Sequence, residues 1–342
     1  MLTAESWRDS MTDTPAALGF RMPAEWEKQQ AVWIAYPHNP ETWPGIMQSV
    51  RKTFMEYYRV VAEECGEKAF VLSGGNPLQL PAGAQAFDYP TNDTWCRDYG
   101  PTFLKNDISG ELAIAHFKYN AWGGKFPPWD HDAAIPERIA ETFHLRRFEI
   151  PVVCEGGALE VDGKGTLITT ESVILNPNRN PGMSKAAAEK ILCDALGCDR
   201  VIWLKSGLAG DDTDGHVDTQ VRFFRPGAVI MATSDTGENA LVSANNRRTL
   251  EEADLEIVEL PCPPLIPPPD GWREEFLPAT YANFLITNNC VLVPVYGFAD
   301  EDAEALEIIS KCFPNRKVKG INCREIILEG GALHCLSQQM PE

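Results

Sequence analysis

The sequence predicts an α/β fold assembled from repeated strand–helix units. Three observations support this prediction: segments with helical spacing alternate with short apolar segments, strand–turn–strand segments lie between them, and the letters EGGAL occur at 155–159 and again at 329–333. The paired glycines permit a sharp turn or a close backbone approach that a side chain would forbid. We therefore read each EGGAL as the turn of one repeat, and the strand–turn–strand segments argue against a simple doubly wound sheet.

Four helix-then-strand units follow one another along the chain. In the first, apolar residues at helical spacing stop at Gly66 and a strand-like segment follows; in the third, Ser184 is suited to cap a helix that ends at Gly197. The pair Asp162-Gly163 predicts a hairpin between two strands. The four units occupy residues 46–73, 135–153, 184–204 and 303–322.

No internal boundary separates these units into domains. The proline-rich segment 261–272 is too short and too apolar in its surroundings for a linker, and we predict an ordered loop or strap there. Residues 1–18 are predicted to form an N-terminal extension, which we expect to be flexible, and residues 19–342 a single folded domain.

Composition excludes several classes of function. The chain has 49 acidic against 30 basic residues, a net charge of -19, whereas nucleic-acid binding depends on clustered Lys and Arg. This charge suits a cationic small molecule, although many soluble proteins are acidic for solubility alone. The N-terminal residues lack an apolar run of signal-peptide length, and no run of about 18 apolar residues occurs. We expect a cytoplasmic protein without nucleic-acid or membrane partners.

The 10 cysteines are scattered singly, without the C-x-x-C pairs of metal sites or the dense spacing of a disulfide scaffold. We expect most of them to be buried, reduced thiols.

A first candidate site lies at residues 209–224, where turn residues give way to alternating polar and apolar residues after Gly215. The alternation predicts a strand with His216, Asp218 and Gln220 on one face, and residues two apart on a strand lie about 7 Å apart. The alternative is an edge strand whose polar face lies in water. Four acidic residues within this stretch suit a bound cation or a raised pKa of the imidazole: Asp211, Asp212, Asp214 and Asp218.

A second candidate site is NDTWCRDYGPTF, in which Trp95, Asp98 and Tyr99 stand close together. A carboxylate beside aromatic rings suits a planar cation, which is bound at its edge and stacked on its face. The alternative is an Arg97/Asp98 ion pair on a surface loop.

A third candidate is Cys335, which follows the second EGGAL turn and has His334 beside it. Successive strand residues point to opposite faces, so His334 is a poor base for its own neighbour and His216 a better partner. From the residues alone, Cys335 is no more reactive than the other cysteines, of which Cys96 and Cys154 also adjoin these motifs.

Taken in order, the motifs identify a resemblance that covers nearly the whole chain. They are MPAEWEKQQAVWIAYPHNPETWP, NDTWCRDYGPTF, EGGALEVDGKGTLITTESVILNPNRNP, WLKSGLAGDDTDGHVDT and EGGALHCLSQQMP. The chain resembles the agmatine deiminases of the guanidine-modifying superfamily, relatives of the Porphyromonas-type peptidylarginine deiminases. The resemblance implies the pentein fold, a five-bladed α/β propeller of ββαβ repeats around a central active site, for the single domain of 19–342.

The resemblance also implies roles for individual residues. The nucleophile falls on Cys335, the general acid and base on His216, the carboxylate paired with that histidine on Glu155, and the guanidinium-binding carboxylates on Asp98 and Asp218. Asp212 would bind the amine of the substrate, Trp95 would form a wall of the pocket, and Glu329 would be structural. The implied reaction converts agmatine to N-carbamoylputrescine and ammonia through a covalent amidino-cysteine, in putrescine biosynthesis, without metal or cofactor; the family also suggests a homodimer.

Other readings are a deiminase of arginine or peptidylarginine, a Cys-His-Asp protease, and a non-catalytic pentein that binds ribosomes. The chain departs from the family pattern at Asp214 and Thr219, where asparagine is common, and at Ala332-Leu333, where Asn-Ile is expected. These departures bear on substrate preference more than on reaction class.

Overall fold

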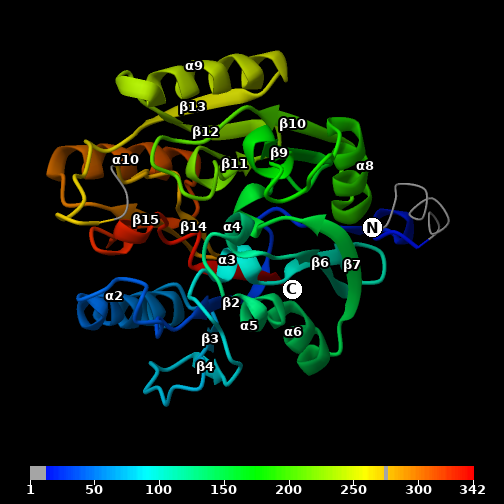
Figure 1. Cartoon of the computed structure of the whole chain (residues 1–342), viewed down its shortest axis with the longest axis horizontal. Helices are drawn as coiled ribbons and strands as arrows, with labels where there is room; N and C mark the ends of the chain where they lie inside the picture. The colour runs from blue at the N-terminus through cyan, green and yellow to red at the C-terminus, as the bar shows by residue number, and fades with distance from the viewer. Residues whose placement is uncertain (1–12, 273–275) are drawn as a thin grey trace.

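A computed structural model describes residues 13–272 and 276–342, and these residues form five small sheets arranged around a centre (Figure 1). Each sheet contains an antiparallel pair of strands, and a helical connection leads from the second strand to a third that lies parallel to it. Each sheet is therefore one ββαβ blade, as the resemblance predicted.

The strands are as follows. Blade one contains β17 (Ser337–Pro341), β2 (Gln29–Ala35), β3 (Ala69–Leu72) and the added β4 (Ala84–Phe87). Blade two contains β5 (Thr102–Asn106), β6 (Leu112–Lys118), β7 (Arg146–Val153) and the added β1 (Phe20–Arg21). Blade three contains β8 (Glu160–Val161), β9 (Thr166–Thr170) and β10 (Arg200–Leu204); blade four, β11 (Val221–Arg225), β12 (Ala228–Thr233) and β13 (Glu256–Pro261); blade five, β14 (Leu285–Ile286), β15 (Cys290–Val295) and β16 (Lys317–Asn322).

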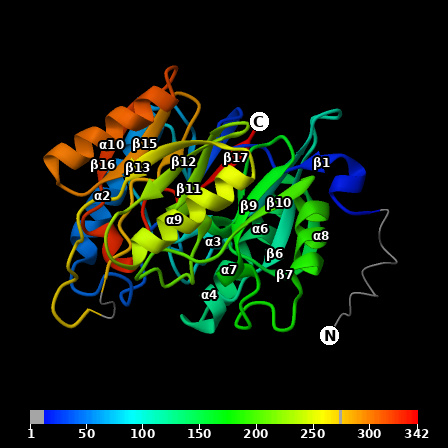
Figure 2. The same ribbon diagram turned by 90° about the horizontal axis from the view of Figure 1, so that it is seen from above.

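The longer helices lie at the periphery, and Figure 2 shows α8 and α10 at opposite ends with strands between them. The connecting helices are α2 (Met47–Arg59) continued by η2 (Val60–Glu64), α4 (Ala121–Gly124), α5 (Asp130–Ala133), α6 (Ile135–Phe143), α7 (Glu171–Ile174), α8 (Lys185–Leu196), α9 (Gly237–Glu252) and α10 (Ala299–Cys312). No helix within the described ranges is long and apolar enough to cross a membrane.

Local chemistry sets the ends of the predicted elements. Ser184 Oγ accepts a hydrogen bond from Ala187 N at 3.2 Å, which caps α8, and Gly197 ends that helix in the left-handed conformation. The hairpin predicted at Asp162-Gly163 joins β8 to β9. Residues 1–12 of the predicted extension lie outside the described residues, while Ala16–Leu18 form a 3-10 helix, η1, before β1.

The strand predicted from His216 onward is wrong. Val217–Thr219 form a 3-10 turn, η4, and β11 begins only at Val221. The turn is stabilised because the side chains of Thr219 and Gln220 both donate hydrogen bonds to the carbonyl of His216, at 2.9 Å each. A turn, not a strand face, therefore sets the relative positions of His216 and Asp218.

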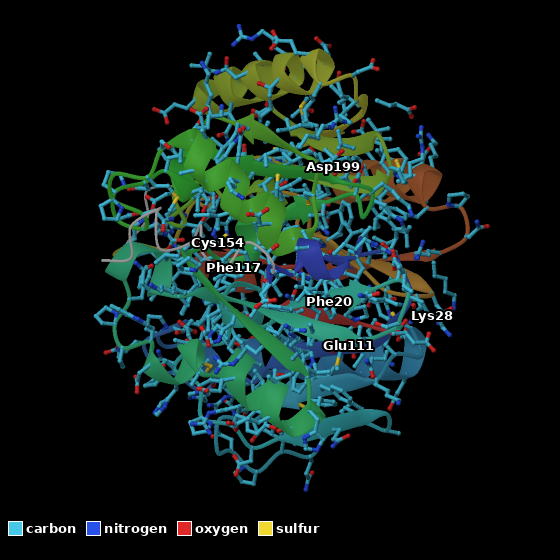
Figure 3. All side chains as sticks on the ribbon, turned by 90° about the vertical axis from the view of Figure 1, so that its right-hand side faces the viewer. Phe20, Lys28, Glu111, Phe117, Cys154 and Asp199 are labelled. Carbon is cyan, nitrogen blue, oxygen red and sulfur yellow. The ribbon has the colours of Figure 1, made fainter. Side chains whose placement is uncertain are left out.

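Apolar side chains fill the space between neighbouring blades and their helices. Figure 3 views the side where Phe20, Phe117 and Cys154 belong to one such cluster, which also receives Leu192 from α8. All 10 cysteines lie in the described part of the chain and are free, and six of them are buried, as expected of reduced core thiols. The proline-rich segment leaves β13 without further regular structure, and Trp272 Nε1 donates to Leu328 O at 2.6 Å.

Each blade's first strand is entered by a short turn near the centre of the ring. These turns are α3 (Cys96–Tyr99) before β5, η3 (Gly156–Ala158) before β8, η4 before β11, residues 280–284 before β14, and η5 (Ile326–Glu329) with the following loop before β17. The two EGGAL copies occupy equivalent turns, in blades three and one. This position explains why the sequence repeats.

Candidate active site

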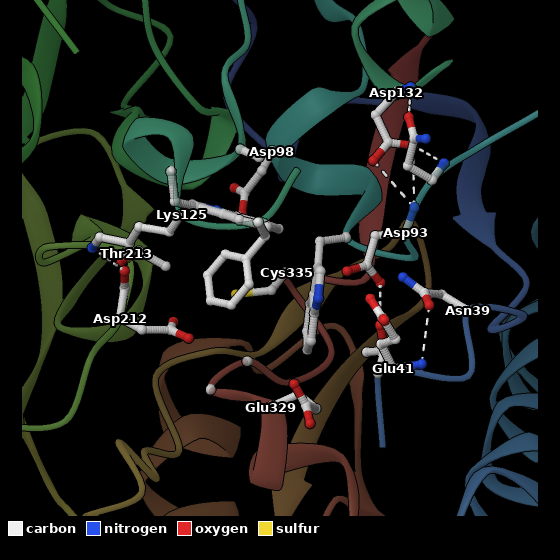
Figure 4. A pocket seen from close by; sticks show the side chains of 18 of the residues that line it. Asn39, Glu41, Asp93, Asp98, Lys125, Asp132, Asp212, Thr213, Glu329 and Cys335 are labelled. Carbon is white, nitrogen blue, oxygen red and sulfur yellow. Dashed lines mark hydrogen bonds between the residues drawn. The ribbon is translucent and has the colours of Figure 1, made fainter. Parts of the chain in front are cut away.

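A cavity of about 490 Å³ lies beside three of these turns, and its lining includes Asp98 of α3, Thr219 of η4 and Glu329 of η5 (Figure 4). Trp95, Asp98, Asp212 and Cys335, four of the predicted site residues, line it. The other three, Glu155, His216 and Asp218, are fully buried and adjoin these residues. The structure thus gathers residues from four blades at one place.

Asp98 lies at the end of the cavity next to His216. Its Oδ1 accepts a hydrogen bond from Gly157 N at 3.0 Å, and its Oδ2 accepts one from Trp122 Nε1 at 2.9 Å. Burial raises the pKa of Asp98 to about 6, although the nearby His216 opposes this shift. A Cβ on Gly157 would fall 2.5 Å from His216 Nδ1 and 2.8 Å from Asp98 Oδ1, so this EGGAL glycine is needed for the two side chains to approach.

The surface pair considered for Arg97 and Asp98 is contradicted, because Arg97 is only 2% exposed. Its Nε donates to His334 O at 3.2 Å, and its Nη1 bonds to the side chains of Gln338 and Gln339 in β17. Arg97 therefore ties the turn of blade two to the segment that carries Cys335.

His216 lies between two carboxylates from other blades. Its Nδ1 is 3.6 Å from Asp98 Oδ1, and its Nε2 is 3.6 Å from Glu155 Oε2. Burial would lower the pKa of His216, but the charges of Asp98 and Glu155 raise it to about 10, so the ring is protonated at neutral pH. The sequence predicted a raised pKa from the local acids. Asp218 contributes to it, but the larger effects come from Asp98 and Glu155, which are distant in the chain.

Glu155 is held by a buried arginine that the sequence analysis did not single out. Arg179 Nε donates to Glu155 Oε1 at 2.9 Å, and both side chains are fully buried. Burial opposes ionisation of Glu155, yet His216 and Arg179 lower its pKa below the ordinary value. Arg179 also bonds to Asp214 and to the carbonyl of Thr213, so it joins Glu155 to the loop before His216.

Cys335 lies beside Asp218 and an asparagine from blade five. Its Sγ is 3.5 Å from Asp218 Oδ2 and accepts a hydrogen bond from Asn283 Nδ2 at 3.1 Å. Asn283 Oδ1 accepts from Ala332 N at 3.1 Å and Cys335 N at 3.2 Å, which fixes the second EGGAL turn. Burial raises the pKa of the Cys335 thiol well above its ordinary value, and the charges of Asp218 and Asp98 raise it further.

Several polar atoms at this centre are buried and have no hydrogen-bond partner among the described residues. They are Glu155 Oε2, His216 Nδ1, His216 Nε2 and Asp218 Oδ1. An unsatisfied buried polar atom costs about 1–3 kcal/mol. Both nitrogens of His216 face carboxylate oxygens at 3.6 Å, so Asp218 Oδ1 is the atom of this group that a polar ligand would complete.

The opposite part of the cavity is acidic and aromatic. Figure 4 shows Asp212 and Glu329 on the side of Cys335 away from Asp98. Trp95 packs on Trp43 at 5.5 Å between ring centroids and forms one wall. Glu329 also accepts a hydrogen bond from Trp43 N at 3.2 Å, which agrees with a structural role, but it lines the cavity as well.

Comparison with known proteins places this site in context. The family model of Porphyromonas-type peptidyl-arginine deiminase matches residues 21–341. A protein of Marinomonas sp. (strain MWYL1), named as a candidate agmatine deiminase, is 36% identical, with 96% of each chain covered. The structure of the agmatine deiminase of Enterococcus faecalis catalysing its reaction has a TM-score of 0.89 and 32% identity, covering 96% of this chain and 98% of that one.

A third similar protein is a cysteine-to-serine variant of the C. jejuni agmatine deiminase with substrate bound, with a TM-score of 0.85 and 28% identity over 94% of this chain and 96% of that one. The match to the family model and to the full-length relatives agrees with the five-bladed architecture and with the order of the motifs. The chain belongs to the Porphyromonas-type peptidyl-arginine deiminase family.

Proposed function

We propose that this protein is an agmatine deiminase, which hydrolyses the guanidinium group of agmatine to N-carbamoylputrescine and ammonia through a covalent amidino-cysteine. The observation that carries the proposal is the gathering of three carboxylates, an imidazole and a thiol in one place. Asp98, His216 and Glu155 adjoin one another, Asp218 adjoins Cys335, and Asp98 and Cys335 line the same cavity. A guanidinium is a planar cation whose N–H groups require acceptors on its edges, and this arrangement offers them.

We assign binding of the guanidinium to Asp98 and Asp218. The two carboxylates raise the pKa of the Cys335 thiol in the free protein, so a cation bound between them would reverse this effect and favour the thiolate. Substrate binding would thus generate the nucleophile, and the released thiol proton would pass to solvent.

We assign the chemical steps to Cys335 and His216. The thiolate attacks the central carbon, the C=N electron pair moves to nitrogen, and His216 gives its proton to the terminal nitrogen, which leaves as ammonia. The neutral imidazole then takes a proton from water as the water oxygen attacks the amidino carbon. The carbon–sulfur bond breaks to regenerate the thiolate, and the hydroxyl proton of the product passes to solvent, which leaves the neutral ureido group. Glu155 would hold the imidazole in place and stabilise its charge.

The amine of agmatine would lie in the acidic part of the cavity, with Asp212 as its partner and Trp95 as a wall. Free arginine carries a carboxylate near that end, which Asp212 and Glu329 would repel. We therefore expect agmatine to be strongly preferred over arginine. A cytoplasmic homodimer in putrescine biosynthesis remains our expectation from the family.

The test is ammonia release, with the mass of the ureido product, from purified protein given agmatine, arginine or a benzoyl-arginine amide in parallel. We expect product from agmatine, loss of turnover in Cys335→Ala, and retained turnover in the matched Cys193→Ala variant, whose cysteine lies on α8. Full activity of Cys335→Ala would refute the mechanism. Preference for the arginine amide would redirect the proposal to peptidylarginine.

A further inference from the structure

The residue before the nucleophile, His334, has no role in the mechanism above, yet it is buried against the catalytic centre. Its exposure is 2%, its Nδ1 lies 2.6 Å from Asp218 Oδ2, and its Nε2 lies 2.8 Å from Glu25 Oε2. Both ring nitrogens are thus occupied by carboxylates. The ring is unavailable as a base for Cys335.

The hydrogen bonds define the protonation state of this ring. A neutral imidazole has a single N–H and would satisfy only one of two carboxylates. Glu25 already accepts hydrogen bonds from Arg222 Nη2 and from Ile286 N, each at 2.6 Å, and these bonds favour its ionised form. Burial opposes ionisation of Glu25 and Asp218, but Arg222 lowers the pKa of the first and His334 that of the second. An ionised carboxylate only accepts hydrogen bonds, so both nitrogens of the His334 ring must donate, and the ring is an imidazolium.

The charges around His334 support the same conclusion. Arg97 Nη2 lies 4.0 Å from Glu25 Oε2, and Arg222 Nε lies 3.0 Å from Glu160 Oε2. An imidazolium at His334 makes this buried group of the described residues electrically balanced, with three cations and three carboxylates: His334, Arg97, Arg222, Glu25, Asp218 and Glu160. A neutral ring would leave the buried Asp218 carboxylate without a cation in direct contact among the described residues, which is unfavourable. Other groups near Asp218 are His216, Asp98, Asp211 and the Cys335 thiol, and Arg316 acts on Glu25.

The consequence falls on Asp218. Because His334 occupies Oδ2, only Oδ1 remains for a ligand, and Oδ1 is the buried oxygen without a partner among the described residues. His334 Nδ1 contacts the same carboxylate oxygen, Oδ2, that lies 3.5 Å from Cys335 Sγ, so a positive ring offsets the charge that disfavours the Cys335 thiolate.

We propose that His334 is a positioning residue: as an imidazolium clamped between Glu25 and Asp218, it fixes the Asp218 carboxylate with Oδ1 toward the guanidinium and offsets its charge near Cys335. This inference rests on the proposed deiminase function. Glu25, at the start of the chain's first blade, is then part of the same support.

The protonation state is tested directly by ¹⁵N spectra of histidine-labelled protein. At pH 8 we expect imidazolium signals from both His216 and His334; the His334 signal persists in His216→Asn and disappears in His334→Gln, where the His216 signal remains. Absence of an imidazolium signal in His216→Asn at pH 8 would overturn the proposal, whatever the protein does with agmatine. This measurement therefore separates failure of the clamp from failure of the proposed function.

The kinetic test compares His334→Gln with His131→Gln, which changes a half-exposed histidine outside this group. We expect His334→Gln to raise KM for agmatine and to lower kcat/KM about 10- to 100-fold, because a hydrogen bond between charged groups is lost. We also expect the pH midpoint of Cys335 alkylation by iodoacetamide to rise. A variant that folds, as judged by circular dichroism, with an unchanged KM and alkylation midpoint would refute the positioning role.

If His334→Gln fails to fold, Glu25→Gln provides the second variant. It keeps the side-chain shape and a hydrogen-bonding oxygen but removes one of the two charges that hold the ring protonated. We expect the imidazolium signal of His334 at pH 8 to be weaker or absent in this variant, since the ring then has one ionised partner. An imidazolium that is unaffected by this change would contradict the clamp.

Discussion

The buried pair of Arg179 and Glu155 gives the sharpest prediction. Replacing Arg179 with methionine keeps much of the side-chain volume but leaves the Glu155 carboxylate buried without its cation, and also removes the bonds to Asp214 and Thr213. Removing one partner of a buried ion pair costs about 3–5 kcal/mol. For a chain of this length, that loss corresponds to a melting temperature lower by roughly 4–7 °C.

The assay is thermal unfolding followed by tryptophan fluorescence, with agmatine turnover measured on the same samples at 25 °C. Arg225→Met is the matched control, because Arg225 pairs with Glu256 where the side chains are 50% and 57% exposed. An exposed pair contributes about 0–1 kcal/mol, so the control should melt within roughly 2 °C of the unaltered protein. Equal shifts in the two variants would refute the claim that burial makes the Arg179 pair strong. Normal turnover in folded Arg179→Met would refute its part in holding Glu155.

Three further predictions concern charge and hydrogen bonding. Because burial raises the pKa of Asp98 to about 6, KM for agmatine should rise as pH falls through that value; a KM constant from pH 8 to 5 would contradict guanidinium binding by this carboxylate. Burial would raise the pKa of Glu25, but Arg222 lowers it below the ordinary value. Ionised Glu25 therefore stabilises the fold fully above its unfolded pKa of about 4.3. This stabilisation is lost as pH falls from that value toward the lower pKa of the folded state. Glu25→Gln should therefore lower the melting temperature at pH 7 more than at pH 3, and an equal difference at both would oppose this reasoning. Trp122→Phe removes the hydrogen bond to Asp98 and should lower kcat/KM about 10- to 100-fold. The control Trp203→Phe loses a hydrogen bond to a glutamate on α8 and should leave kcat/KM unchanged. Equal losses of kcat/KM in the two variants would count against a role for Trp122.

Much of the fold follows from local sequence. Helical spacing, the Ser184 cap and the glycines that end helices act over a few residues, and the structure forms these elements where they were predicted. The EGGAL repeat also indicated the repeated architecture, because each copy lies at an equivalent turn. The strand predicted at His216 failed since Thr219 and Gln220 bind the His216 carbonyl and turn the chain, an interaction that alternation of polar and apolar residues does not reveal.

The support of the site could not be predicted because it depends on residues far apart in the sequence. Arg97 bonds to side chains in β17, and Glu155 pairs with Arg179. Cys335 accepts a hydrogen bond from Asn283, which belongs to another blade. Nothing in the letters around Asn283 distinguishes it from a polar residue in an ordinary turn. The repeat offered the one available signal, since Asn283 stands just before the first strand of blade five, as the other site residues stand before theirs.

The pairing of β17 with β2 has a consequence for the order in which activity is acquired during synthesis. Gln338 in β17 pairs with Trp33 in β2, so blade one is completed by a strand that follows every other strand in the chain. A ribosome therefore synthesises the other blades, with Asp98, Glu155, His216 and Asp218, before it adds Cys335. Until then the β2 edge lacks its antiparallel partner and is open to pairing with other chains. If the proposed function holds, the growing polypeptide is inactive until the last segment is made, because Cys335 stands two residues before the strand that closes the ring.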